Sequence, residues 1–420
     1  MPTLWENSRM LTWSTAGESH GPALVALLEG MPAGVPLSTD VISAALSRRR
    51  LGYGRGARQK FEQDVVRILA GVRHGFTTGA PIAIEIANSE WPKWETVMSA
   101  DPVSAESLQV DAGRGDTREM ARNRTLTRPR PGHADLAGMV SYNLTDARDV
   151  LERASARETA ARVALGACAN AYLESVSDIA IVSRVVAVGA EAAYGQPLPQ
   201  PQDQAALDDS GVRNLDPAVE ARFVAAIDAA QAAGDTIGGV AEVAAWNLPI
   251  GLGSHVSGEQ RLDARLAAAL MGIQSVKAVE IGDGFAQASS LGSSAHDEIL
   301  LDSSGGVRRG SNHAGGLEGG TTNGMPLVVR AGFKPISTVP KALRTVDLET
   351  GEESTAFHQR SDTCQVAPGA VIAEAMVALE LARALDERLG GRSVAEARAH
   401  MEWYEDYCRD RLCRGSADGE

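Results

Sequence analysis

Histidine, arginine and glycine gather in short segments that lie far apart in the chain. The first segment is Gly17–Gly21, in which His20 stands between a serine and a glycine. Backbone that contains glycine can approach a ligand closely, and a histidine can accept or deliver a proton near neutral pH. A polar turn with a surface histidine explains this segment equally well, so the segment alone does not indicate a catalytic site.

Six basic residues lie between Arg48 and Lys60, with no acidic residue among them. Cations this close repel one another unless an anion is held there. A solvated basic helix end is the alternative, because cations are favourable at a helix C-terminus. The run continues past the expected helix into a glycine-flanked turn at Arg55, which favours an anion-binding site.

Two further segments combine histidine, arginine and acids. In Arg130–Asp135, Asp135 could orient the imidazole of His133 or cap the helix that follows. In Arg153–Thr159, a serine at an expected helix start is followed three residues later by Glu158, which predicts a capping box. The start of that helix, with arginines beside it, would also attract an anion.

Glycine-rich backbone follows nearer the end of the chain. Ser311–Gly316 and Gly319–Gly320 precede Lys334–Thr338, and backbone amides with lysine, serine and threonine suit a phosphate. The spacing matches neither a Walker A loop nor a dinucleotide-binding fingerprint, and a flexible surface loop is the alternative. His358–Cys364 holds an arginine and an aspartate two residues apart, for which a local ion pair is the simpler interpretation.

The chain as a whole is acidic. It has 420 residues, a formal net charge of −14 and 44% hydrophobic residues, which is typical of a globular protein and argues against one that coats nucleic acid or membranes. Only five of its 40 basic residues are lysine. Base composition explains that choice of residue but not the clustering. We expect reduced cysteines, no bound metal, no membrane span and no signal peptide, and therefore a cytoplasmic location.

The elements that must position these segments are helices and strands in mixed order, which predicts an α+β fold. Long loops are expected at Ser89–Arg130 and Gly282–Gly324, and an exposed connection at Gln196–Val212. The predicted helices are Asp40–Arg50, Ser155–Ser175, Pro217–Ala233, Gly258–Met271, Ala370–Leu389 and Val394–Arg411, and the predicted strands are Ala23–Leu28, Val65–Leu69, Ile82–Ile86, Ile179–Val188, Val240–Trp246, Ala278–Ile281 and Leu327–Ala331.

Taken together and in order, the segments resemble the chorismate synthase family over about Leu11–Leu385. This resemblance implies a β-α-β sandwich, a single domain at 11–414 between an N-terminal extension (1–10) and a short tail (415–420), and a homotetramer. The segments that carry it are GESHG (17–21), RRRLGYGR (48–55), RPGHAD (130–135), SARETAARVALGA (155–167), VEIGDGF (279–285), SNHAGG (311–316) and the stretch around Arg360 and Asp362.

The resemblance also implies a reaction. The family converts 5-enolpyruvylshikimate 3-phosphate to chorismate and phosphate by 1,4-anti elimination, the last step of the shikimate pathway towards aromatic amino acids. It uses reduced FMN, here supplied by an external flavin reductase with NADPH as a possible reductant. The substrate carries a phosphate and two carboxylates, so cations and a proton donor near the leaving group would lower the barrier.

Site residues follow from the resemblance position by position. His20 would act at the leaving phosphate, His133 at the flavin and Asp362 in removal of the ring proton. Arg49, Arg55, Arg130 and Arg157 would contact the phosphates of the substrate or NADPH. The expected FMN contacts are Arg153, Ala154, Ser155, Gln274, Ser275, Gly319, Lys334, Pro335, Ile336, Ser337, Thr338 and Arg360.

Two stretches depart from the family pattern. ERASARE at 152–158 replaces the frequent GRSSARE, so Ala154 lacks a hydroxyl and FMN would be held there by backbone amides or by Ser155. Leu108–Arg124 looks longer than usual. Two other functions remain as alternatives: a flavoprotein with net hydride transfer, which would consume NADPH stoichiometrically, and a non-catalytic binder of anionic polymers, which the net charge disfavours.

Overall fold

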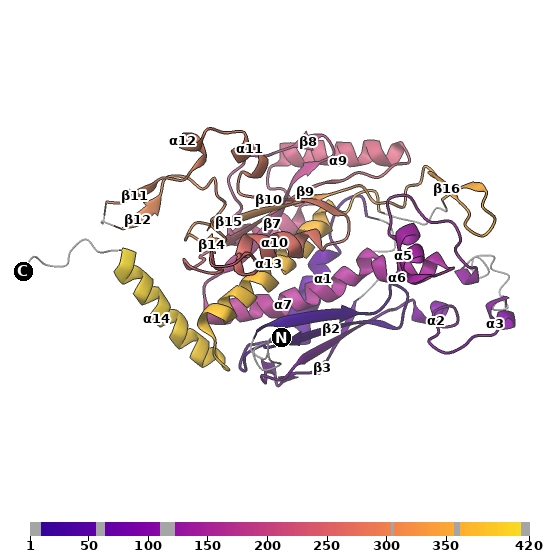
Figure 1. The fold of residues 1–420 in the computed structure, drawn as a ribbon, viewed down its shortest axis with the longest axis horizontal. Helices are drawn as coiled ribbons and strands as arrows, with labels where there is room; N and C mark the ends of the chain where they lie inside the picture. Colours follow the sequence, from indigo (N-terminus) through magenta and orange to yellow (C-terminus); the bar gives the residue numbers. More distant parts are fainter. Residues whose placement is uncertain (1–9, 56–63, 110–121, 304–305, 357–361, 413–420) are drawn as a thin grey trace, which may run out of the picture.

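The computed structural model describes residues 10–55, 64–109, 122–303, 306–356 and 362–412. A layer of helices lies between two antiparallel sheets (Figure 1). This arrangement agrees with the expected α+β sandwich. Among the described helices, none combines the length and the hydropathy that a membrane-spanning segment requires.

The first sheet has four strands in the order β1 (Thr12–Ala16), β2 (Ala23–Glu29), β6 (Ile82–Ala87) and β3 (Val65–Ala70). Successive side chains of a strand point to opposite faces of the sheet. Leu24, Ala26 and Leu28 of β2 are therefore buried together, opposite the isoleucines of β6. This inner face packs against the central helices, and the outer face is exposed.

The second sheet has five strands in the order β10 (Val276–Ile281), β15 (Leu327–Phe333), β9 (Gly239–Trp246), β7 (Ala180–Val188) and β8 (Glu191–Ala192). β7 and β9 are buried along most of their length. Helix α13 (Val366–Leu389) packs against both of them, and α8 (Gln204–Asp209) and α9 (Pro217–Ala232) also contact β7. This double cover explains why their sequences read as nearly continuous apolar runs.

Two long helices form the centre of the molecule, α7 (Thr159–Val176) and α13 (Val366–Leu389). They approach so closely that a Cβ atom added at Gly166 would lie 2.4 Å from the Cβ of Ala375. Around them lie α1 (Thr39–Arg49), α10 (Leu262–Met271) and α14 (Val394–Leu412), which extends away from the body, whereas α9 (Pro217–Ala232) lies on the far side of the second sheet (Figure 1).

Every predicted helix and strand is present within a few residues, whereas several short elements were missed. Some of the missed elements lie in the segments that were expected to be loops. The expected exposed connection at Gln196–Val212 contains α8, in which Leu207 is fully buried. The missed elements are β1, β4 (Val72–Arg73), β5 (Phe76–Thr77), α2 (Trp91–Trp94), α3 (Ala105–Gln109), α5 (Asp135–Tyr142), α6 (Ala147–Ala154), β8, η3 (Pro201–Asp203), α8 (Gln204–Asp209), α11 (Gly284–Ala288), α12 (Gly292–Ala295), β11 (Ile299–Leu301), β12 (Val307–Arg309), β13 (Leu317–Glu318), β14 (Thr321–Thr322), β16 (Arg344–Val346) and β17 (Glu353–Thr355).

The start of the long helix was predicted wrongly. A short 3-10 turn, η2 (Ala156–Glu158), precedes α7, and the hydroxyl of Ser155 accepts a hydrogen bond from the amide of Arg157. The predicted capping box does not form, because the Glu158 carboxylate binds other side chains. Another short 3-10 turn, η4 (Gly258–Gln260), precedes α10 in the same way.

A buried acid near the end of α13 generates a prediction about pH. Burial and the neighbouring Glu387 raise the pKa of Asp386 to about 7, although the amide of Leu11 acts against them. An unfolded aspartate releases its proton near pH 3.9, so between about pH 4 and pH 7 the folded state binds more protons. Stability should therefore fall as the pH rises through this window, by ~4 kcal/mol at most.

The variant Asp386→Asn should lose this part of the pH dependence and exceed the parent in stability at pH 8. Urea unfolding at pH 5 and pH 8 measures both effects. The exposed Asp406 on α14 provides the control variant, Asp406→Asn. Equal pH dependence in the parent and Asp386→Asn would contradict the account.

Candidate active site

His20 lies in the loop between β1 and β2 and is held from two sides. Its Nδ1 lies 2.9 Å from each carboxylate oxygen of Glu152, a residue of α6. The indole of Trp94 in α2 stacks on the imidazole, with ring centroids 3.8 Å apart. His20 is 9% exposed and Glu152 is 1% exposed, so the ring has a defined orientation at the edge of the interior.

The segment between α6 and α7 contacts the same loop. The Ser155 hydroxyl lies 3.2 Å from that of Ser19, and the Arg153 guanidinium donates to the carbonyls of Thr15 and Gly17. Two expected flavin contacts therefore lie beside the loop that carries His20.

Two arginines of the expected phosphate set also reach this segment. Arg49 is buried and donates to the Thr159 hydroxyl at 3.1 Å, while Arg157 forms an ion pair with Asp64. Nη2 of Arg157 is buried and has no hydrogen-bond partner among the described residues. The start of α7 therefore concentrates positive charge and holds a donor that a ligand could satisfy.

The carboxylate of Glu158 connects this group to the second sheet. It accepts hydrogen bonds from the Thr15 hydroxyl at 2.5 Å, Arg162 at 2.9 Å and the Gln274 amide at 3.0 Å. Burial alone would raise the pKa of Glu158, but the charge of Arg162 and these hydrogen bonds lower it below its usual value. The Oε1 of Gln274 is buried and has no partner among the described residues.

The second expected histidine, His133, belongs to a separate group. Its Nδ1 lies 2.5 Å from Asp135, and Arg130 donates to the same carboxylate at 2.9 Å and to the Thr338 hydroxyl at 3.2 Å. Burial would raise the pKa of Asp135, yet the hydrogen bonds from His133 and Arg130 hold it well below its usual range. Asp135 thus orients the imidazole and does not cap α5.

The third expected catalytic residue, Asp362, forms an ion pair with Arg55, with 3.1 Å between nitrogen and oxygen. The residue after it accepts a hydrogen bond from the amide of Ile237. The neighbouring Thr236 hydroxyl donates to the carbonyl of Ile336 at 2.8 Å. Asp362 is therefore connected to the Lys334–Thr338 segment.

Lys334–Thr338 is the segment that the three groups share. The amide of Lys334 donates to the carbonyl of Ser275 at 2.9 Å, which connects it to Gln274, and its ammonium group donates to the carbonyl of Gly132. These contacts place the segment beside Gly132 and Gln274, and Glu158 extends the link from Gln274 to the first sheet. Gly132 also lies close to this segment, because a Cβ atom added at Gly132 would lie 3.6 Å from the Cβ of Ser337.

Other expected positions lie elsewhere. The turn that contains Gly319 contacts the start of α10, where Gly320 accepts from the amide of Leu262, whereas Gln274 follows the end of that helix. Ten residues of helix span about 15 Å, so Gly319 is not gathered with the other expected flavin contacts of the chain. Arg360 lies outside the described residues.

The glycine-rich SNHAGG segment is held by Asp297. This carboxylate accepts from the Ser311 hydroxyl at 2.5 Å and from the amides of His313 and Ala314. Burial acts to raise the pKa of Asp297, but these hydrogen bonds lower it. The segment is therefore an ordered turn within the chain and not a flexible surface loop.

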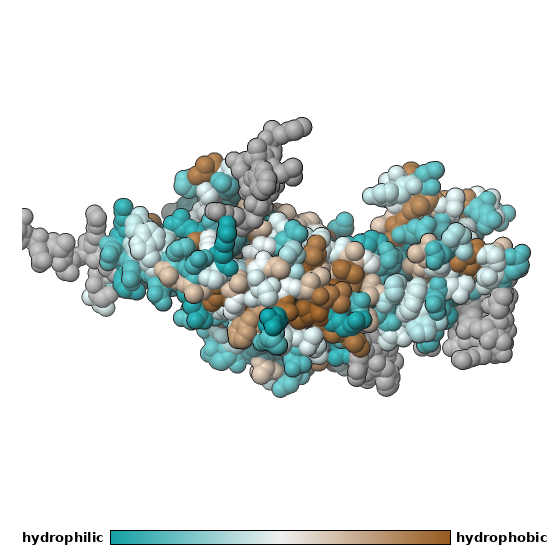
Figure 2. All heavy atoms as spheres, turned by 90° about the horizontal axis from the view of Figure 1, so that it is seen from below, coloured by the Kyte–Doolittle hydropathy of each residue, from teal (hydrophilic) through white to brown (hydrophobic). Residues whose placement is uncertain are grey.

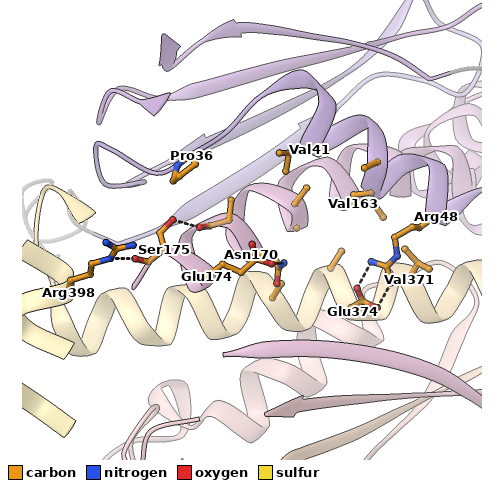
Figure 3. Close-up of a pocket in the computed structure, with 17 residues that line it drawn as sticks. Pro36, Val41, Arg48, Val163, Asn170, Glu174, Ser175, Val371, Glu374 and Arg398 are labelled. Carbon is orange, nitrogen blue, oxygen red and sulfur yellow. Dashed lines mark hydrogen bonds and ion pairs between the residues drawn. The ribbon is translucent and has the colours of Figure 1, made fainter. Parts of the chain in front are cut away.

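The basic run at Arg48–Arg55 is not free of acids in three dimensions. Arg48 binds Glu374 of α13 at 2.6 Å and Asp208 of α8 at 2.9 Å, so the expectation of unneutralised cations is wrong there. This ion pair lies at one end of a groove of about 500 Å³ between α1, α7 and α13 (Figure 3). The groove is lined mainly by aliphatic side chains and by none of the expected site residues.

The comparisons with known proteins decide the family. A family model described as chorismate synthase matches residues 11–385. The chain belongs to the chorismate synthase family. The chorismate synthase of Mycolicibacterium smegmatis is 60% identical over 94% of this chain and 96% of that protein, and the one of Rhodococcus jostii is 58% identical over 96% of this chain and all of that protein.

A solved structure agrees with this assignment. A crystal structure described as chorismate synthase superposes with a TM-score of 0.73 at 37% identity, and the match covers 96% of this chain and 99% of that one. The chain is therefore an enzyme of the chorismate synthase family, a carbon–oxygen lyase of the shikimate pathway that acts on a small molecule.

Chorismate synthases use a flavin, and the residues present fit one. Gln274 presents a buried oxygen without a partner among the described residues, and Arg157 presents a buried nitrogen of the same kind. Ser275 has a positive φ of 72°, and its carbonyl is bound to Lys334. Amide, hydroxyl and ammonium groups of these segments are the donors that a flavin ring and its phosphate require.

The buried pair of Arg130 and Asp135 generates a stability prediction. Replacing Asp135 by Asn would remove the negative charge that Asp135 places beside the buried Arg130 guanidinium, which costs about 3–5 kcal/mol. The half-exposed pair of Glu191 and Arg222 is the matched control, and Glu191→Gln should cost less than about 1 kcal/mol. Urea unfolding at pH 7 compares the two variants, and equal losses would contradict the role given to Asp135.

Proposed function

We propose that the enzyme converts 5-enolpyruvylshikimate 3-phosphate to chorismate and phosphate by 1,4-anti elimination, with reduced FMN as cofactor. The C–O bond to phosphate breaks, a proton leaves the ring and a new double bond forms, so the reaction has no net redox change. The observation that carries this proposal is the placement of His20 against Glu152 of α6, in a loop that Arg153 and Ser155 also contact.

His20 is suited to the leaving phosphate. Because Glu152 occupies Nδ1, Nε2 is the nitrogen available to a substrate. Arg49 and Arg157 lie at the start of α7, where a helix N-terminus also favours anions. Positive charge fixed beforehand around a developing phosphate dianion lowers the barrier more than charge that must reorganise.

Reduced FMN would be held by Arg153 and Ser155, by Gln274–Ser275 and by Lys334–Thr338. Ala154 and Arg360 are further expected contacts, whereas Gly319 lies apart from Gln274 within one chain. When bound, the reduced flavin supplies an electron-rich ring that assists loss of phosphate. His133, oriented by Asp135, would hold a proton beside it, and Asp362 would assist removal of the ring proton.

We further propose a cytoplasmic homotetramer that receives its reduced flavin from an external reductase, with NADPH as a possible source of electrons. The outer face of the first sheet supports assembly with further copies of the chain. Val25, Val65 and Leu69 are 40%, 54% and 52% exposed there, and the view from below shows an apolar area on this side of the molecule (Figure 2). Exposed apolar patches often mark protein interfaces.

An anaerobic assay with chemically reduced FMN tests the proposed reaction. Phosphate and chorismate should appear in equal amounts, and His20→Ala or His133→Ala should lower kcat by about 10²-fold or more, as for acid–base groups. His400→Ala, at an exposed site on α14, is the control and should retain full activity. Absence of both products would refute the proposal, and stoichiometric NADPH consumption in their place would favour hydride transfer.

A further inference from the structure

We infer that Glu152 is a positioning residue for His20, and that it fixes which imidazole nitrogen faces the substrate. This inference deepens the proposed function and rests on it for the role of His20. The resemblance to the family assigns no role to Glu152, which is the first residue of ERASARE, where the frequent pattern has glycine.

Glu152 binds both the ring and the backbone of His20. The two carboxylate oxygens each lie 2.9 Å from Nδ1, and one of them also accepts the backbone amide of His20 at 2.9 Å. The carbonyl of Glu152 accepts the amide of Ser19 as well. A carboxylate accepts hydrogen bonds and cannot donate them, so it selects the form of the ring with a proton on Nδ1.

One face of the ring is covered by Trp94. Its indole stacks on the imidazole at an interplanar angle of 23°, and the guanidinium groups of Arg122 and Arg148 lie 5.1 Å and 5.5 Å from the indole centroid. Arg148 also lies 3.8 Å from the carboxylate of Glu152. The imidazole is therefore fixed at one edge by the acid and over one face by the indole.

The chemical consequence concerns the two protonation states of His20. In the neutral ring Nδ1 carries the proton, so Nε2 is the acceptor. When Nε2 gains a proton, the ring becomes an imidazolium that can donate to a phosphate oxygen, and the adjacent carboxylate stabilises its charge. A buried carboxylate orients and stabilises a histidine in the same way in the Ser-His-Asp triad.

A purely structural role explains Glu152 poorly. Burial of a carboxylate is costly, and well-packed apolar residues often replace buried ion pairs without loss of stability. Glu152 also lies in the last turn of α6, where the helix dipole disfavours negative charge. Arg148 at 3.8 Å offsets part of this cost, but among the described residues only His20 lies within hydrogen-bond distance of both carboxylate oxygens.

Nitrogen NMR of the full chain, labelled with ¹⁵N at histidine, tests the inference directly. The His20 signals are assigned by their loss in His20→Ala. The parent should show His20 protonated at Nδ1 and unprotonated at Nε2, and Glu152→Ala should show a mixture of both neutral forms. Glu191→Gln, an exposed acid, should leave the signals unchanged. An unchanged tautomer in Glu152→Ala would overturn the inference.

Kinetics provide the second readout. Glu152→Ala and Glu152→Gln should lower kcat by about 10²-fold while KM for the phosphorylated substrate and the affinity for FMN change less than about threefold. In the His20→Ala background the same substitution should have little further effect, because the two residues act as a unit. Losses that multiply in the double variant would overturn the inference.

The two experiments separate the possible failures. If the parent releases no chorismate, the proposed function fails, while the tautomer of His20 still reports on Glu152. If Glu152→Ala does not fold, Glu152→Gln preserves the shape of the side chain and is used in both measurements. Its amide can present nitrogen as well as oxygen to Nδ1, so a parent-like tautomer together with parent-like kcat would contradict the inference.

Discussion

The buried carboxylate of Glu158 is the interaction on which the arrangement of the site depends. It binds Thr15 of the first sheet, Arg162 of the central helix and Gln274 in the connection to the second sheet. Breaking any one of these contacts would leave a buried charge less well compensated, which is expensive. The carboxylate thus fixes how the two sheets and the helix layer meet where the expected cofactor and substrate contacts gather.

The same principle recurs across the site, where basic side chains are paired with acids, which come from distant parts of the chain for Arg55 and Arg157. Arg55 meets Asp362, Arg130 meets Asp135, and Arg157 meets Asp64. Most of these groups are largely buried, so their positions are set before a ligand binds. A polyanionic substrate would then meet cations that are already oriented, which is the condition for effective electrostatic stabilisation of a transition state.

Much of this organisation could be predicted from the sequence. The rest could not, because it depends on contacts between residues that are far apart in the chain. Apolar periodicity located the long helices and the strands, because each buries one face or is covered on both. The start of α7 was not predicted correctly, because a capping box is a local pattern. Glu158 instead accepts hydrogen bonds from Thr15 and Gln274, which are more than 100 positions away. The ion pairs of Arg48 could not be predicted for the same reason, because Asp208 and Glu374 lie on α8 and α13.

The candidate site likewise has one part that local motifs indicate and another part that depends on packing. Ordered motifs pointed to His20, His133 and Asp362, but no local pattern could indicate Trp94 or Glu152, whose roles exist only after α2 and α6 have packed on the loop between β1 and β2. The ERASARE departure was a visible signal at Glu152, yet its meaning requires the distance to His20. Gly319 and Gln274 illustrate the converse, because motif order alone cannot show that α10 separates them.

A crystal structure of the enzyme with FMN and the enolpyruvyl phosphate substrate tests the central claim most directly. The account predicts a phosphate oxygen within about 3 Å of Nε2 of His20, with Nδ1 still bound to Glu152 and the flavin against Lys334–Thr338. Substrate bound away from His20, for example in the groove between α1, α7 and α13, would contradict it.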